Sequence, residues 1–188
     1  MKLAIITGAA SGIGHALTQL YLQRQVKVLM VDKDALKLQQ ASQSLLEQFP
    51  GQVIAAPCDI RQETQVRNLA CLVKDAGYEI HWIYNNAGII GTLDPIWESP
   101  IQTIQEVMDV NLFGMIHVIQ AFMPLLLGQS FRSHIVNMAS MYALYSSSQT
   151  TAYTMSKHAV LALSESLYFD LKRLDKPVDR SEERRVGK

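Results

Sequence analysis

Residues 3–14 read Leu3-Ala-Ile-Ile-Thr7-Gly8-Ala-Ala-Ser11-Gly12-Ile-Gly14, and this stretch decides the fold. A short apolar run that ends at a glycine is typical of a buried strand. Leu17, Leu20 and Tyr21 then recur at helical spacing. The stretch therefore predicts a strand, a glycine-rich turn and a helix. Such a turn gathers backbone N–H groups and a helix N-terminus at one point, which favours binding of a phosphate.

Strand and helix patterns alternate along the rest of the chain. Strands are expected at 26–31, 52–57, 80–84 and 134–138, and helices at 34–49, 62–75, about 100–127 and 151–172. This alternation predicts a doubly wound parallel sheet of the Rossmann type, in three α/β/α layers. Such folds bind ligands beyond the carboxyl ends of the strands. The polar or small residues at those ends are Gly8, Asp32, Asp59, Asn86 and Ser140.

Length and composition exclude several classes of function. The 188 residues suit a single domain, and a net charge of zero predicts no binding to nucleic acid or to an anionic membrane. The run 115–127 is interrupted by polar residues and by Pro124, so no membrane span is expected. Cys58 and Cys71 lie far apart, the five histidines match no metal spacing, and no signal peptide is evident. These features predict a cytoplasmic protein without a metal site.

Asp32 ends the second expected strand, eighteen positions after Gly14. A carboxylate at this place accepts hydrogen bonds from both ribose hydroxyls of an adenosine and repels a 2′-phosphate. Ser11 offers no positive charge for that phosphate, although the neighbouring Lys33 could pair with it. The sequence therefore favours NAD over NADP. The alternative for Asp32 is an exposed cap on the next helix.

Tyr153 and Lys157 lie four residues apart, so a helix places both side chains on one face. Free tyrosine ionises near pH ~10, and an ammonium about 4 Å away favours the ionised form by several kcal/mol at an effective dielectric of ~20. The pair could therefore act as an acid and base. Alone the spacing is weak, because it recurs by chance in many helices.

The combined motifs resemble those of the classical short-chain dehydrogenase/reductase family. The residues that carry the resemblance are Thr7-Gly8-Ala-Ala-Ser-Gly12-Ile-Gly14, Asn85-Asn86-Ala87-Gly88, Asn111, Ser140 and Tyr153-Thr-Met-Ser-Lys157. The resemblance covers residues 2 to about 176. It implies hydride transfer between NAD(H) and an alcohol or ketone.

The resemblance also implies a role for each matching residue. Tyr153 would be the general acid/base, and Lys157 would promote its ionisation and hold the nicotinamide ribose. Ser140 would bind the substrate oxygen, and Asn111 would hold a proton-relay water. Asp59 would contact the adenine amine. The implied cofactor-binding set is Gly8, Ser11, Gly12, Ile13, Gly14, Asp32, Asp59, Ile60, Asn86, Ala87, Gly88, Tyr153 and Lys157.

The last expected helix carries two apolar stripes. Val160, Leu163, Leu167 and Leu171 continue the face of Tyr153 into the core. A second stripe, Met155, Ala159, Ala162 and Phe169, requires another partner. Relatives of the resembled family pair this helix and the long preceding one across a two-fold axis, so a homodimer or homotetramer is expected.

The chain departs from the family pattern after residue 176. Family members continue into a sixth strand ending in Pro-Gly, a substrate loop and a seventh strand, none of which is evident. Residues 1–176 are therefore expected to form an incomplete catalytic domain, 177–188 a flexible charged tail, and the fifth strand a bare edge. An inactive, truncated fragment that only binds dinucleotide is the alternative to an enzyme, and a non-catalytic dinucleotide sensor is a third possibility.

Overall fold

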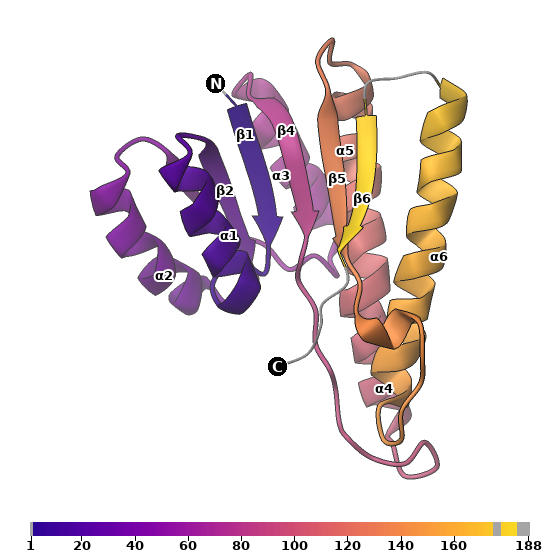
Figure 1. Ribbon diagram of the computed structural model, residues 1–188. Helices are drawn as coiled ribbons and strands as arrows, with labels where there is room; N and C mark the ends of the chain where they lie inside the picture. Colours follow the sequence, from indigo (N-terminus) through magenta and orange to yellow (C-terminus); the bar gives the residue numbers. More distant parts are fainter. Residues whose placement is uncertain (1, 175–177, 184–188) are drawn as a thin grey trace.

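The computed structural model describes residues 2–174 and 178–183. Its strands form one parallel sheet in the order β3-β2-β1-β4-β5-β6 (Figure 1). Their bounds are β1 (Lys2–Thr7), β2 (Lys27–Asp32), β3 (Val53–Pro57), β4 (Glu79–Asn85), β5 (Ser133–Met138) and β6 (Val178–Glu183). The predicted doubly wound α/β fold is confirmed.

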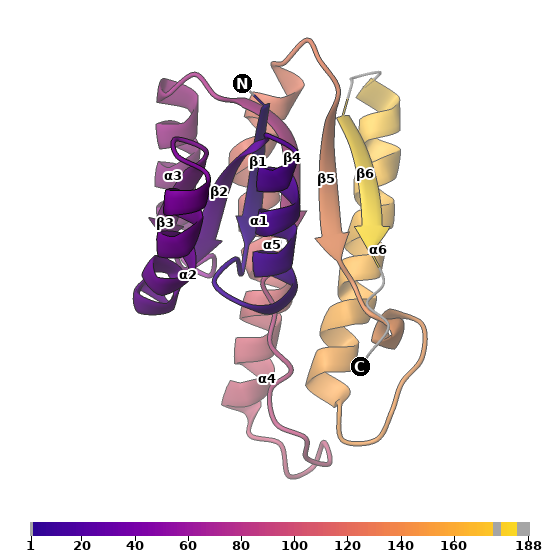
Figure 2. The same cartoon turned by 60° about the vertical axis from the view of Figure 1, so that its left-hand side comes forward.

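Helices cover the sheet from both sides, as Figures 1 and 2 show. They are α1 (Gly12–Gln23), α2 (Ala35–Gln48), α3 (Glu63–Asp75), α4 (Ile101–Met108), α5 (Gly114–Leu127) and α6 (Thr151–Leu174). Alternate residues of β1 enter opposite cores: Ala4 and Ile6 pack in the core with α1 and α2, and Leu3 and Ile5 in the core with α3, α5 and α6. This alternation follows from the period of two along a strand.

A single turn of π-helix, η1 (Asp109–Phe113), joins α4 to α5 within the long helix that the sequence predicts. Asn111 lies in this turn and is fully buried. Such π-turns inside α-helices often occur at functional sites. The turn thus places the polar side chain of Asn111, for which the resemblance implies a role in the site, inside an otherwise apolar helix.

The continuous segment Ile101–Leu127 is long and apolar enough to cross a membrane by length and composition, contrary to the estimate from its interrupted run. The core helix of a soluble protein meets the same criteria. Here Met115, Val118, Phe122 and Leu126 are buried in the core beside the sheet. The apolar composition is thus accounted for by packing within the domain.

The expectation of a charged flexible tail from residue 177 is wrong for residues 178–183. They form β6, which pairs in parallel with β5 from Ser133↔Val178 to Met138↔Glu183. Backbone N–H and C=O groups make this pairing, so a charged segment can add to an open edge. Val178 is 5% exposed, and Asp179 contacts Arg132 Nε at 3.2 Å. The predicted bare edge at β5 is therefore also wrong, and residues 177 and 184–188 lie outside the described ranges.

Candidate active site

The glycine turn after β1 requires glycine for two different reasons. Gly8 has φ +65°, a left-handed conformation that side chains disfavour. A Cβ on Gly14 would lie 2.2 Å from the carbonyl oxygen of Gly8 and 2.7 Å from Nδ2 of Asn86. The turn is therefore compact, and α1 begins directly behind it at Gly12.

Thr7 and Asn86 join this turn to the end of β4. The hydroxyl of Thr7 accepts from the backbone N–H groups of Asn86 and Ala87, each at 3.0 Å. In return, Nδ2 of Asn86 donates to the carbonyl of Thr7 at 2.9 Å. The two strand ends are thus fixed to each other beside the turn.

These strand ends enclose a cleft of about 380 Å³, which we call the glycine cleft. Every predicted cofactor-binding residue of the first half lines it except Gly14, which supports the turn from beneath. The lining residues are Gly8, Ser11, Gly12, Ile13, Val31, Asp32, Lys33, Cys58, Asp59, Ile60, Asn86, Ala87, Gly88, Ile89 and Val110.

Asp32 is held by backbone N–H groups at the rim of the cleft. Its Oδ2 accepts from the N–H of Ala10 and its Oδ1 from that of Asp34, each at 3.1 Å. Each carboxylate oxygen retains a further lone pair. The separate residue Asp34 caps α2 by accepting from the N–H of Lys37. A cap is therefore already present, and Asp32 remains available to the cleft.

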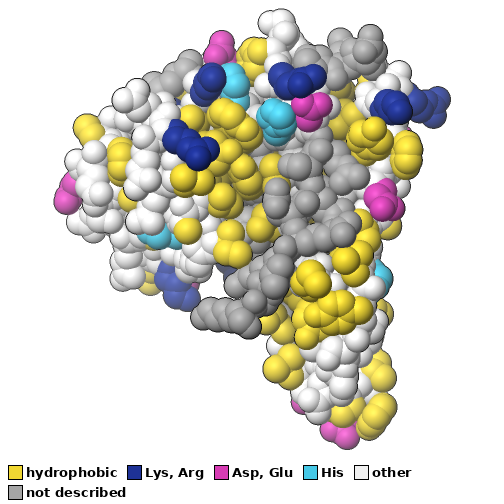
Figure 3. All heavy atoms as spheres, in the orientation of Figure 1, with side chains coloured by type: hydrophobic (Ala, Val, Ile, Leu, Met, Phe, Trp, Pro, Cys, Tyr) yellow, Lys and Arg dark blue, Asp and Glu magenta, His cyan; other side chains and the backbone are white. Residues whose placement is uncertain are grey.

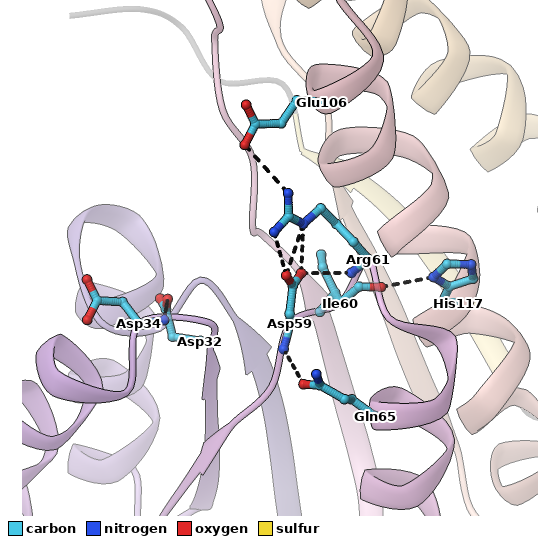
Figure 4. Close-up of polar contacts among 8 residues, drawn as sticks. All are labelled: Asp32, Asp34, Asp59, Ile60, Arg61, Gln65, Glu106 and His117. Atoms are coloured by element: carbon cyan, nitrogen blue, oxygen red, sulfur yellow. Dashed lines mark hydrogen bonds and ion pairs between the residues drawn. The ribbon is translucent and has the colours of Figure 1, made fainter. Parts of the chain in front are cut away.

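Asp59 also lines the cleft, but its carboxylate is engaged by a neighbour (Figure 4). Arg61 donates to Oδ2 from Nη2 at 2.6 Å and to both oxygens from Nε at 3.0 Å. These hydrogen bonds lower the pKa of the Asp59 carboxyl from its usual value. Arg61 in turn contacts Glu106 at 3.6 Å. Asp59 thus has less acceptor capacity left for a ligand than Asp32.

Tyr153 and Lys157 line a second, smaller pocket of about 50 Å³, which we call the Tyr153 pocket. It shares Ile13, Asn86, Gly88 and Ile89 with the glycine cleft. Lys157 is 4% exposed, and its Nζ donates to the carbonyl of Met138 at 2.7 Å. The same ammonium lies 5.5 Å from the ring centroid of Tyr153. The sequence spacing therefore places a fixed positive charge beside the phenol.

Asn111 reaches this pocket from behind Gly88. Its amide both accepts from the N–H of Ile89, at 2.8 Å, and donates to the carbonyl of Ile89, at 2.9 Å. A Cβ on Gly88 would lie 3.2 Å from Oδ1 of Asn111 and 3.7 Å from Nζ of Lys157. Glycine at this position leaves room for both the amide and the ammonium beside it.

Ser140 caps the short 3₁₀ turn η2 (Met141–Ala143) and is 4% exposed. Its hydroxyl accepts from the N–H of Tyr142 at 3.3 Å. The ring of Tyr142 packs edge-on against that of Tyr153, with centroids 5.8 Å apart. Ser140 adjoins the pocket-lining Ala139 without lining the pocket itself.

Four contributors to the site have no clear signal in the sequence. They are the hydroxyl of Thr7, the guanidinium of Arg61, the carbonyl of Met138 and the hydroxyl of Ser156, which accepts from Asn111 at 2.9 Å. Thr7 and Ser156 lie inside the recognised motifs. The motifs predict where these residues lie in the fold but not the hydrogen bonds that their hydroxyls make. Met138 meets Lys157 only through folding, whereas Arg61 contacts Asp59, two residues earlier in the chain.

The two connected pockets fit an elongated ligand with a phosphate near its middle. The glycine turn and the N-terminus of α1 provide the conformation and dipole that favour a phosphate. The Asp32 carboxylate on one side can accept hydrogen bonds from hydroxyls, and the Lys157 ammonium on the other can donate to them. A nicotinamide dinucleotide has this order of groups, and the residues present fit it.

Comparison with known proteins agrees with this geometry. The pattern of the short chain dehydrogenase family matches residues 2–175, and the chain belongs to that family. It is 36% identical over 172 residues to a 1-deoxy-11-beta-hydroxypentalenate dehydrogenase of Streptomyces exfoliatus. The aligned region covers 91% of this chain and 62% of the relative. The chain thus spans less than two thirds of that relative's length.

Two examples illustrate the solved structures that share the fold. One is a short chain dehydrogenase/reductase from Burkholderia phymatum in complex with NAD, with a TM-score of 0.92, 34% identity and coverage of 97% of this chain and 64% of that one. A short chain dehydrogenase from Shigella flexneri complexed with NADP has a TM-score of 0.86 and 23% identity over 94% of this chain and 73% of that one. The fold alone therefore does not select between the two cofactors.

Proposed function

We propose that the chain is an NAD(H)-dependent oxidoreductase that interconverts an alcohol and a carbonyl compound. The observation that carries the proposal is the shared wall between the glycine cleft and the Tyr153 pocket. It brings a dinucleotide-binding turn next to a tyrosine with a buried ammonium beside it. A sensor that only bound dinucleotide would not need the second pocket.

The glycine cleft would hold the adenosine and pyrophosphate portion of the cofactor. Asp32 would accept hydrogen bonds from the adenosine ribose and disfavour a 2′-phosphate, which supports NAD over NADP. Lys157 would donate to the ribose at the other end. When bound, the nicotinamide supplies or accepts the hydride, so the protein's task is placement and proton transfer.

Tyr153 would donate a proton to the carbonyl oxygen in reduction and accept one from the hydroxyl in oxidation. The ammonium of Lys157, fixed by Met138 and 5.5 Å from the ring centroid, stabilises the phenolate that forms. Ser140 would donate its hydroxyl to the substrate oxygen as negative charge develops there. Asn111 holds the loop at Ile89 in place beside both groups.

The surroundings of the pocket favour an apolar substrate. Ile90, Leu93 and Trp97 in the loop before α4 are 53%, 60% and 81% exposed, and Leu144 and Tyr145 after η2 are 50% and 49% exposed. Figure 1 places both loops at the same end of the molecule, and Figure 3 shows hydrophobic side chains gathered over that projection. Residues 141–150 contain no charged side chain.

The outer faces of the long helix and of α6 support the expected homo-oligomer. Met155 and Phe169 are 42% and 62% exposed on α6, and Phe113 is 48% exposed in η1. A second copy would bury these side chains. We therefore retain self-association as part of the proposal, with mass measurement in solution as its test.

The direct test incubates the purified chain with NAD and a panel of apolar secondary alcohols. We expect NADH formation by the parent chain and its loss, by about 10²–10⁴-fold, in Tyr153→Phe. Tyr142→Phe, in the ring that packs against Tyr153, is the matched control and keeps its turnover. Equal activity of Tyr153→Phe and the parent would refute the assignment of the acid/base.

A further inference from the structure

Helix α6 carries Tyr153 and Lys157, and its inner face also carries two fully buried serines. Ser156 and Ser164 are both 0% exposed, with the equally buried Val160 between them. The apolar stripe expected from the sequence omits these serines. Eight residues along an α-helix span about 12 Å. Both hydroxyls point from α6 into the core of the domain, and each has a polar partner on another element.

The partners are two asparagines on different elements. Nδ2 of Asn111, in η1, donates to Oγ of Ser156 at 2.9 Å, and the hydroxyl of Ser156 donates a hydrogen bond to the carbonyl of Tyr153 at 2.7 Å. Nδ2 of Asn137, in β5, donates to Oγ of Ser164 at 2.9 Å. These two Asn–Ser contacts tie α6 to the rest of the domain, one beside the pocket and one two turns away.

The amide of Asn137 joins two other elements. Its Oδ1 accepts from Nδ2 of Asn85, in β4, at 2.9 Å, while its Nδ2 faces Ser164. The next residue of β5, Met138, offers its carbonyl to Lys157. Adjacent residues of one strand end therefore contact α6 at Ser164 and at Lys157. The position of the ammonium and the Asn137–Ser164 contact are set by the same two elements.

Apolar and polar contacts constrain a helix differently. The packing of Val160 and its apolar neighbours is not directional and tolerates small sliding movements. A buried hydrogen bond weakens steeply with distance and angle, and a broken one leaves an unsatisfied group in the core. A shift of α6 by one residue, about 1.5 Å along its axis with a rotation of about 100°, would break both Asn–Ser contacts.

We propose that Ser164 is a positioning residue: with Ser156, it fixes the axial position of α6 and thereby places Lys157 and Tyr153 for the proposed reaction. Ser164 lines neither the glycine cleft nor the Tyr153 pocket, so it acts only through the helix. The proposal rests on the proposed function for its catalytic consequence. Its structural consequence, the placement of the Lys157 ammonium, stands independently.

The test compares Ser164→Ala with Ser164→Thr, which keeps the hydroxyl. The ¹⁵Nζ resonance of Lys157 is recorded at fixed pH without cofactor, and turnover is measured with NAD and a secondary alcohol. In Ser164→Ala we expect a displaced Lys157 resonance and a kcat about 10-fold lower, with the KM for NAD within about two-fold of the parent. Ser164→Thr restores both.

Ser42→Ala is the matched control, because Ser42 is also a buried helical serine, 3% exposed, and donates only within α2 to the carbonyl of Gln39. It should lower thermal stability without moving the Lys157 resonance. If Ser164→Ala likewise changes only stability, the proposal is overturned. If the parent shows no turnover, the proposed function fails, and the resonance still decides the positioning. Should Ser164→Ala not fold, Ser156→Ala tests the other contact by the same resonance.

Discussion

The glycine cleft and the Tyr153 pocket share a wall but are built in different ways. The cleft owes its shape to backbone and to glycines such as Gly8 and Gly14, where an added Cβ would lie within 3 Å of other atoms, with carboxylates at its rim. The pocket depends on buried polar side chains, Asn111, Ser156 and Lys157, each hydrogen-bonded to another element. In the proposed function the first region would bind the cofactor and the second would perform the chemistry, so substitutions in the two should have separable effects.

The largest expected effect is that of Lys157→Met. It removes the buried positive charge beside Tyr153 and the donor to the Met138 carbonyl. We expect kcat to fall by about 10³-fold, because the phenolate is no longer stabilised. Lys74→Met, at the exposed end of α3, is the control and leaves turnover unchanged. Steady-state kinetics with saturating NAD measures the difference.

Gly14→Ala should damage the cleft through its shape alone. The new methyl group would overlap the Gly8 carbonyl and the Asn86 amide, so we expect about 1–3 kcal/mol of destabilisation and loss of NAD affinity. Gly51→Ala is the control: its φ of +75° disfavours alanine, but no atom lies within 4 Å of the added carbon. Urea unfolding and NAD titration follow both variants. Equal NAD affinity in Gly14→Ala and the parent would argue against a phosphate at the turn.

The glycine cleft and the Tyr153 pocket also show how much of the site the sequence could predict. The glycine spacing, Asp32 and the Tyr153–Lys157 pair are local patterns that follow recognisable strands and helices, and the fold placed them where expected. Ser164 was not recognised, because its partner Asn137 lies 27 residues away in the sequence and only folding brings the two together. Arg61 was not recognised although Asp59 is only two residues away, because it belongs to none of the motifs. Strand β6 was missed because edge pairing uses the backbone, and its charged side chains resemble a solvated tail.

Asp32→Ser should alter cofactor choice more than catalysis. Removing the carboxylate removes its repulsion of a 2′-phosphate, so we expect the preference for NAD over NADP to fall by at least about 10-fold, roughly 1.4 kcal/mol. Asp34→Ser, which keeps a capping side chain on α2, is the matched control. A preference for NADP in the parent chain would contradict the role given to Asp32.

The smallest expected effect concerns Asp59 and Arg61, which hold each other at the rim of the cleft. The Arg61 hydrogen bonds keep the pKa of Asp59 below that of the unfolded chain, so they stabilise the fold above about pH 4 and are lost as the pH falls through the folded pKa. Arg61→Met should lower the free energy of unfolding at pH 7 by less than about 1 kcal/mol. It should also reduce the amount by which that free energy falls between pH 7 and pH 3. Urea unfolding at the two pH values measures this, and an unchanged pH dependence would argue against the pair.

The division between binding and chemistry is tested most directly by measuring NAD affinity and turnover together in Asp32→Ala and Tyr153→Phe. We predict that Asp32→Ala loses at least about 10-fold in NAD affinity, yet keeps a kcat within a few-fold of the parent at saturating NAD. Tyr153→Phe should bind NAD as the parent does and lose turnover by at least about 100-fold. If both variants lost affinity and turnover in the same proportion, the two regions would not have separate roles.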